Sequence, residues 1–264
     1  MFHPPEPVTV IVPTYNERAN LAPLAARLFD ALSPNACTLL IVDDDSSDGT
    51  AAEAESLAKQ FPIRCNVRRN ERGLATAVIA GLRAADTPIA VVMDADLSHP
   101  PESIPIMLEK LQDPAVDMVI GSRFAPGGSI DSDWPLHRRL FTASARLLAR
   151  PLTNVRDMMA GFFAVRTADL RLEALKPIGY KIALELIVRH HWEHVAEVPI
   201  RFAERQHGQT KLNFAEQVRY LRHLCRLYAA VLSSRRVEAN AASSAERDAA
   251  ASGKGSVADR EIDS

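Results

Sequence analysis

The feature that most constrains the fold is a repeated alternation of short apolar segments with helical segments in the first half of the chain. The apolar segments are rich in β-branched residues and predict buried strands at residues 8–12, 39–42, 89–93 and 118–120, and residues 64–69 predict a weaker strand. The segments between them predict helices at residues 20–32, 50–60 and 73–85. This alternation predicts an α/β fold whose mostly parallel sheet is flanked by helices on both faces.

The pattern changes after residue 128. The later elements that we predict are a basic helix at 136–149, a strand at 158–165, a helix at 182–194, a strand at 195–202 and a final helix at about 213–234. From Arg236 onward Ala, Ser, Gly and charged residues dominate without periodicity, which is typical of a disordered tail. We therefore predict one domain over residues 1–235 and a tail over 236–264.

Polar residues follow the predicted strands at the points where the strands end. They occupy residues 13–17, 43–45, 94–96 and 123. In a parallel sheet of this kind the ligand lies outside the carboxyl ends of the strands. The sequence therefore predicts a functional site at this edge of the sheet.

Asp94 and Asp96 are the candidate metal ligands. Two carboxylates on one short segment, with coordination positions left for phosphates, suit Mg²⁺ or Mn²⁺. The alternative is a helix-capping aspartate followed by a turn, and an isolated Asp-x-Asp is common. The other acids expected at the same edge favour the metal.

Three consecutive acids, Asp43, Asp44 and Asp45, would repel one another unless a ligand or a cation used part of the cluster. One of them could accept hydrogen bonds from a ribose or a base, as acids after strands do in nucleotide-binding folds. A solvated turn in which only Asp48 has a structural role explains the segment equally well.

Several basic residues are candidate phosphate ligands, although any single arginine is more often a plain surface residue. They are Arg123, Arg138, Arg139, Arg205 and Lys211. The last two flank Gly208 in a basic segment that is expected to close over a ligand.

Composition excludes some classes of partner. The formal net charge of −2 over 264 residues gives no general attraction for nucleic acid. No segment is apolar enough to cross a bilayer, and the N-terminus does not resemble a secretory signal. The three widely spaced cysteines favour a reducing compartment, so we expect a cytoplasmic protein. His190 and His194 are spaced like metal ligands on a helix, but a partly exposed helix end explains them better.

An ordered set of motifs between about Val8 and Leu212 resembles the family-2 glycosyltransferases of GT-A fold, and most closely the dolichol-phosphate mannosyltransferase (polyprenol-monophosphate mannose synthase) branch. The motifs are VIVPTYNERANL, IVDDDSSDGT, RGLATAVIAGLRAA, MDADLSHPPE, GSRF, DMMAGFFAVR, GYKIALELIVR and VAEVPIRFAERQHGQTKL. Each is modest evidence alone, whereas the ordered set is highly specific.

The resemblance implies roles for individual residues. Those that would hold the base and ribose are Pro13, Tyr15, Glu17, Val42 and Asp44. Those that would bind the metal and diphosphate are Asp94, Ala95 and Asp96, and those that would grip the nucleotide sugar are Arg123, Arg205 and Lys211. Those that would meet the acceptor phosphate are Arg123, Arg138 and Thr142. Asp94, Asp96, Arg123, Arg205 and Lys211 are thus the catalytic candidates.

The implied reaction moves mannose from GDP-mannose to a polyprenyl monophosphate with inversion at the anomeric carbon. One alternative is a UDP-sugar donor. Another is a soluble hydroxyl acceptor, which would want a carboxylate base, and Asp157 is the candidate. A third is a non-catalytic module that binds a sugar nucleotide. Retention of both acids and of the basic segment speaks against it.

The chain departs from the family pattern at three places. Ser98 stands where several relatives carry a metal-binding glutamine, Asp45 replaces a small residue, and residues 159–161 replace a more polar stretch. The change at residues 159–161 is expected to alter the sugar or acceptor pocket.

A lipid substrate requires access to a membrane. The helices predicted at 136–149 and 213–233 combine arginines with large apolar residues, as an interfacial helix does, although core packing explains the same apolar positions. We expect peripheral contact with the cytoplasmic membrane face. Docking through a separate membrane subunit stays open.

Overall fold

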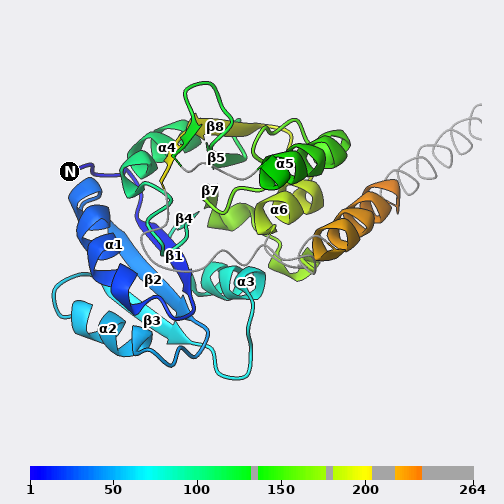
Figure 1. Ribbon diagram of the computed structural model, residues 1–264. Helices are drawn as coiled ribbons and strands as arrows, with labels where there is room; N and C mark the ends of the chain where they lie inside the picture. Colours follow the sequence, from blue (N-terminus) through cyan, green and yellow to red (C-terminus); the bar gives the residue numbers. More distant parts are fainter. Residues whose placement is uncertain (132–135, 177–180, 204–217, 234–264) are drawn as a thin grey trace, which may run out of the picture. The chain divides into compact units, whose positions relative to one another are not determined.

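The computed structural model describes residues 1–131, 136–176, 181–203 and 218–233, and of residues 136–141 the backbone alone. Its centre is a seven-stranded sheet of order β3-β2-β1-β4-β7-β5-β8 (Figure 1). The strands are β1 (Val8–Thr14), β2 (Cys37–Asp43), β3 (Ile63–Val67), β4 (Ile89–Val92), β5 (Met118–Ser122), β7 (Phe163–Arg166) and β8 (Val195–Pro199). A separate two-stranded sheet joins β6 (Ser129–Ile130) to β9 (Arg201–Phe202).

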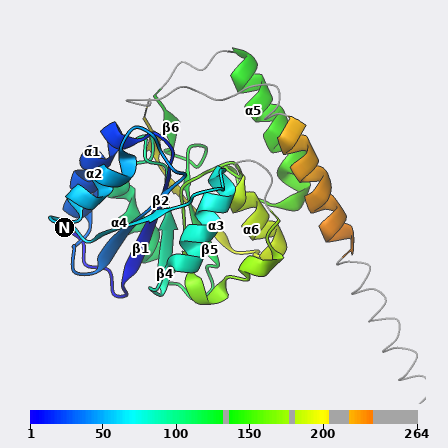
Figure 2. The same cartoon turned by 90° about the horizontal axis from the view of Figure 1, so that it is seen from below.

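Helices cover both faces of the sheet, as the alternation predicts. The apolar residues of α1 (Arg18–Ala31), α2 (Thr50–Leu57) and α4 (Ile104–Leu111) belong to one core cluster. Those of α3 (Leu74–Ala84) and α6 (Ile182–His190) belong to a second cluster on the opposite face (Figure 2). Successive side chains along a strand point to opposite faces and so enter the two clusters in turn. Because both faces are covered, the central strands are apolar throughout. The predicted α/β architecture, a mostly parallel sheet with helices on both faces, is confirmed.

β7 is the one strand of the seven that runs against its neighbours, being antiparallel to both β4 and β5. Its first residue, Phe163, pairs with Val92 at the end of β4 and with Ile120 of β5. The residues that enter β7 therefore lie at the carboxyl edge of the parallel strands. The expectation of a strand from residue 158 is wrong at its start, because the chain turns before β7 and the Ala160 N–H donates to the Asp157 carbonyl within this turn.

Two other predicted elements have different ends. The helix expected to reach His194 ends at His190, because His191 adopts a left-handed conformation with φ 54°. His190 and His194 are consequently not one helical turn apart, and the His190 ring bonds to Leu186 and Arg171. The strand expected at 195–202 is divided into β8 and β9 between the two sheets.

The remaining helices are α5 (Leu136–Ala149) and a C-terminal helix of which residues 218–233 are described. Elsewhere in the described chain, short 3₁₀ turns occur at Pro101–Ser103, Arg150–Leu152, Thr167–Asp169 and Leu172–Ala174. Residues 1–224 form one compact unit, and the second unit begins at Cys225. The predicted tail and residues 213–217 lie outside the described residues, so the domain boundary stays a prediction. Within the described part of the chain, no helix is both long and apolar enough to cross a bilayer.

Candidate functional site

The ends of β1 and β2 bring the predicted base and ribose residues together. Pro13 and Val42 are register partners, and both are buried. Beyond them the chain turns outward, so that Tyr15 lies at the surface. Glu17 is fixed at the start of α1, where its backbone N–H donates to Thr50 Oγ1 at 3.0 Å. The structure therefore places these residues on one continuous edge, as predicted.

The three consecutive acids have three different environments. Asp43 is buried and accepts hydrogen bonds from the hydroxyls of Thr14 and Ser46, at 2.8 and 2.6 Å. Asp44 is buried against Arg68, whose Nε and Nη2 both donate to Asp44 Oδ1. Asp45 is exposed and has φ 55°. The cation that relieves the repulsion is thus a residue of the chain, and the sequence reasoning missed it.

The other oxygen of Asp44 organises the loop before α3. Asp44 Oδ2 accepts the Gly73 N–H at 2.8 Å, and Gly73 has φ 145°, a conformation that side chains disfavour. In the same loop the Arg72 guanidinium lies over the Tyr15 ring, 4.7 Å from its centroid. This loop and the β1 end therefore form adjoining walls beside Asp44.

Asp94 and Asp96 follow β4 at the centre of the edge. Asp96 is buried, and its Oδ1 accepts hydrogen bonds from the backbone N–H and the hydroxyl of Ser98, at 3.1 and 2.6 Å. Asp94 is more exposed, with 28% of its side chain accessible. Ser98 thus supports a predicted metal ligand through hydrogen bonds. Within the described ranges, no group of three or more His, Cys, Asp or Glu side chains is placed to hold a metal ion, and Asp94 and Asp96 remain the predicted donors.

His99 is a second residue that the sequence reasoning missed, although it lies in the same motif. Its Nδ1 accepts the Asp94 N–H at 3.1 Å, and its ring packs against Phe162 and Phe202. Burial lowers the pKa of His99 below its ordinary value, against the opposing charges of Asp94 and Asp96. A neutral ring with Nδ1 as acceptor fixes the backbone that carries Asp94.

Arg123 follows β5 and is paired with Asp157. Arg123 Nε donates to Asp157 Oδ2 and Arg123 Nη2 to Asp157 Oδ1, both at 2.8 Å. The Arg123 backbone N–H also donates to Oδ2, at 3.0 Å. Burial would raise the pKa of Asp157, but the hydrogen bonds and the charge of Arg123 outweigh it and hold that pKa below its ordinary value. Asp157 is therefore charged at neutral pH.

The other predicted phosphate ligands are partly outside the described residues. Thr142 is buried on α5. The side chain of Arg138 lies outside the described part, as do Arg139, Arg205 and Lys211. The structure accordingly brings the residues of β1, β2, β4 and β5 to one edge, and it does not place the basic segment.

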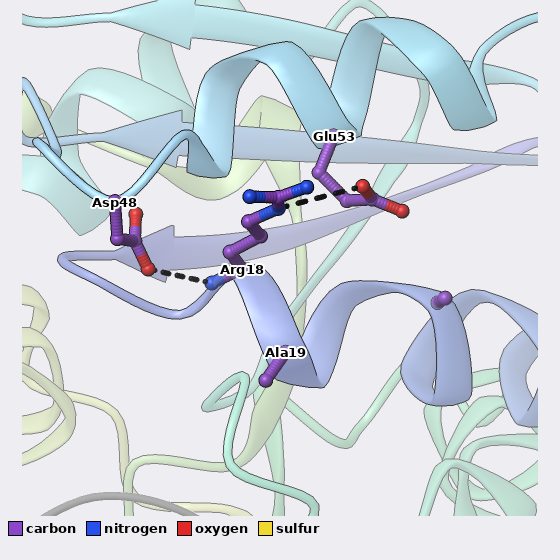
Figure 3. Close-up of a pocket in the computed structure, with 5 residues that line it drawn as sticks. Arg18, Ala19, Asp48 and Glu53 are labelled. Atoms are coloured by element: carbon purple, nitrogen blue, oxygen red, sulfur yellow. Dashed lines mark hydrogen bonds and ion pairs between the residues drawn. The ribbon is translucent and has the colours of Figure 1, made fainter.

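A hollow of about 450 Å³ opens beside the start of α1. Its lining residues are Arg18, Ala19, Ala22, Asp48 and Glu53. Figure 3 shows Arg18 between two acids: its backbone N–H donates to Asp48, and its Nε lies 3.8 Å from Glu53. None of the predicted site residues lines this hollow.

Comparison with known proteins identifies the family of the chain. The model of the family "Glycosyl transferase family 2" matches residues 9–171. The dolichol-phosphate mannosyltransferase of Saccharomyces cerevisiae is 43% identical over 232 residues, which cover 83% of this chain and 86% of that protein. The protein of the same name from Pyrococcus furiosus is 40% identical over 83% of this chain, but this chain spans 63% of its length.

Solved structures agree on the fold. A mannosyltransferase from Pyrobaculum calidifontis, in complex with GDP-Man and Mn²⁺, superposes with a TM-score of 0.62. The alignment covers 86% of this chain and 64% of that one, at 20% identity. At this identity the likeness establishes the architecture alone.

Proposed function

The chain belongs to glycosyltransferase family 2, in its dolichol-phosphate mannosyltransferase branch, and from that premise we propose that it transfers mannose from GDP-mannose to a polyprenyl monophosphate. The observation that carries the proposal is the 43% identity to the yeast enzyme over most of both chains. The Pyrobaculum mannosyltransferase of similar fold, which holds GDP-Man and Mn²⁺, supports the same donor.

The donor nucleotide would lie along the ends of β1, β2 and β4. Tyr15, Glu17 and Asp44, with Pro13 and Val42 beneath them, would contact the base and ribose. Ala95 would face the diphosphate from the segment after β4, and Arg205 and Lys211 would close over it.

Asp94 and Asp96 would hold Mg²⁺ or Mn²⁺. Their oxygen donors suit a hard divalent cation, and the Ser98 hydrogen bonds orient Asp96. When bound, such a cation supplies positive charge next to the diphosphate that leaves. His99 keeps Asp94 in place from the backbone side.

The acceptor is proposed to be a phosphate, held by Arg123, Arg138 and Thr142. A phosphate oxygen is already an anion, so it needs positioning and no general base. A hydroxyl acceptor would need one, and the candidate for that role, Asp157, is charged but bonded through both oxygens to Arg123. The contacts of Asp157 thus favour the phosphate acceptor.

We further propose that the protein contacts the cytoplasmic membrane face. On α5 Leu147 and Leu148 are 74% and 48% exposed, so core packing does not account for them. In the C-terminal helix Leu221 is 48% exposed, next to exposed Arg222. Large apolar side chains beside arginines are the composition of an interfacial helix.

The reaction is tested with purified protein and a short-chain polyprenyl phosphate. We expect metal-dependent transfer from GDP-mannose, little from UDP-glucose, and loss of transfer with EDTA. Asp94→Asn and Asp96→Asn should each reduce the rate by about 100-fold or more, because each removes a direct metal ligand. Efficient transfer from UDP-glucose alone would replace the proposed donor, and transfer from neither donor to the polyprenyl phosphate would reject the function.

Membrane contact is tested by flotation with liposomes that contain anionic lipid. Leu147→Ser/Leu148→Ser should float less than the wild type, while Ile106→Ser, a substitution of an exposed residue on α4, should float normally. Equal flotation of all three proteins would contradict these helices as the contact. Flotation that requires an added membrane protein would point to a separate subunit.

A further inference from the structure

Asp157 is a buried carboxylate that the proposed reaction does not use. Its side chain is 1% exposed, and it lies in the segment that enters the antiparallel strand β7. That segment reaches the carboxyl edge between the end of β4, which carries Asp94, and the end of β5, which carries Arg123. Asp157 therefore stands where the donor and acceptor sides of the site adjoin.

Asp157 and Arg123 form a bidentate ion pair. Two guanidinium nitrogens of Arg123 meet two different carboxylate oxygens, and the Arg123 backbone N–H returns to one of them. A parallel pair of this kind fixes the plane of the guanidinium as well as its position. The Phe124 and Phe202 rings lie 5.5 and 5.1 Å from the guanidinium carbon. The side chain of Arg123 is thus ordered before any phosphate arrives.

Asp157 is held in turn by the edge strand β8. Both oxygens of Glu197 accept backbone N–H groups, those of Arg156 and Asp157, at 3.0 and 3.1 Å. Glu197 is the register partner of Ile120 on β5. Through Glu197, the segment that carries Asp157 is held to β8, which pairs with β5. This segment cannot shift without breaking charge-assisted hydrogen bonds.

We infer that Asp157 is a positioning residue for the transfer, which aims the Arg123 guanidinium at a substrate phosphate and accepts no proton from the acceptor. The inference rests on the proposed function, because it takes Arg123 to be a phosphate ligand. An arginine that is held in place loses less side-chain freedom when it binds the phosphate. Asp157 would then act on the rate only through Arg123.

The test is a double-mutant cycle on the full-length protein, with transfer from GDP-mannose as the reaction. We expect Arg123→Ala to reduce kcat/KM by about 100-fold, because it removes charge-assisted hydrogen bonds to a substrate phosphate. Asp157→Asn should reduce kcat/KM by about 10- to 100-fold, as the loss of a residue that hydrogen-bonds a ligand-binding side chain typically does. The double variant should match Arg123→Ala, since without the arginine the carboxylate has nothing to aim.

Two further measurements separate positioning from a base or from folding. A general base would make the Asp157→Asn loss persist in the Arg123→Ala background, so that the two losses multiply; that result overturns the inference. If Asp157→Asn fails to fold, Glu197→Gln provides the milder variant, and its loss should likewise vanish without Arg123. Asp86→Asn breaks an exposed Arg–Asp pair at the opposite end of β4 and should leave kcat/KM unchanged.

The outcomes also separate this inference from the function beneath it. Wild-type protein that transfers no mannose rejects the proposed function, and with it the inference. Active wild-type protein in which the losses multiply rejects the role of Asp157 alone. Both are supported if the wild type is active, if the double variant loses no more kcat/KM than Arg123→Ala alone, and if Asp157→Asn raises the KM for one phosphate substrate.

Discussion

Asp44 and Arg68 form a buried ion pair in which Nε and Nη2 of the arginine donate to one carboxylate oxygen, at 2.8 and 2.5 Å. The second oxygen of Asp44 holds the N–H of Gly73. One carboxylate therefore joins the end of β2 to the loop before α3. Its orientation at the proposed ribose subsite depends on Arg68, which itself has no predicted contact with the nucleotide.

Replacement of Arg68 by glutamine should weaken nucleotide binding and stability together. The change leaves a buried carboxylate without its cation, and breaking a buried pair typically costs about 3–5 kcal/mol. We expect a lower melting temperature and an affinity for GDP in the presence of Mn²⁺ that falls by about 10-fold or more. Thermal melts and calorimetry measure the two effects. An unchanged affinity would show that Asp44 does not contact the nucleotide.

Ser98→Ala tests the support of the proposed metal site. The variant loses the hydroxyl that donates to Asp96 Oδ1, while the Ser98 backbone N–H remains. Loss of such an outer partner typically reduces metal affinity or activity by about 10- to 100-fold. The Mn²⁺ concentration that gives half-maximal transfer should rise, and excess Mn²⁺ should restore the rate. Ser103→Ala, outside this hydrogen-bond pair, is the matched control, and an identical Mn²⁺ dependence of both variants would contradict the role.

Gly121→Ala should destabilise the sheet beside the site. A Cβ at Gly121 would lie 2.4 Å from Cδ1 of Phe162, a fully buried ring that packs on His99. Overpacking of this kind typically costs about 1–3 kcal/mol. We expect the melting temperature to fall by about 2–10 °C. Phe162→Leu in the same background should recover part of the loss by making room; no recovery would show that the clash is not the cause.

Glu185→Gln tests the buried contact between α6 and His223. Glu185 accepts hydrogen bonds from His223, the Lys176 N–H and Arg189. Burial would raise the pKa of Glu185, but these partners outweigh it and lower that pKa. A lowered carboxyl pKa stabilises the fold above the ordinary value near ~4.3, and this contribution is lost as the pH falls through the lowered pKa.

The glutamine variant should therefore be less stable than the wild type at pH ~7, by about 1–3 kcal/mol. The difference should narrow as the pH falls below ~4, where the wild-type carboxylate takes up its proton. Urea unfolding over this pH range gives the free energy of each protein. A difference that stays constant with pH would contradict the charged state of Glu185.

The sheet and the residues at its edge were predictable because they depend on local patterns. Buried parallel strands are apolar throughout, and each ends where its polar residues begin, so Asp44, Asp94 and Arg123 could be assigned to one edge before any coordinates. The ordered motifs then supplied the family.

The partners of these residues were not predictable, because pairing depends on spatial neighbours that are far apart in sequence. Arg68 lies 24 residues from Asp44, and Asp157 lies 34 residues from Arg123. Nothing in the periodicity showed that β7 would insert antiparallel between β4 and β5, which is what brings Asp157 to the edge.

The antiparallel entry of β7 also restricts how such a chain can change over evolution. At one end of the short stretch 157–161 Asp157 binds Arg123, and directly after its other end the Phe162 carbonyl accepts the Gly121 N–H. A stretch secured at both ends cannot gain or lose a residue as a surface loop does. A relative with a different specificity would therefore arise by substitution at a fixed length, and each substitution there would change the surroundings of both Asp94 and Arg123.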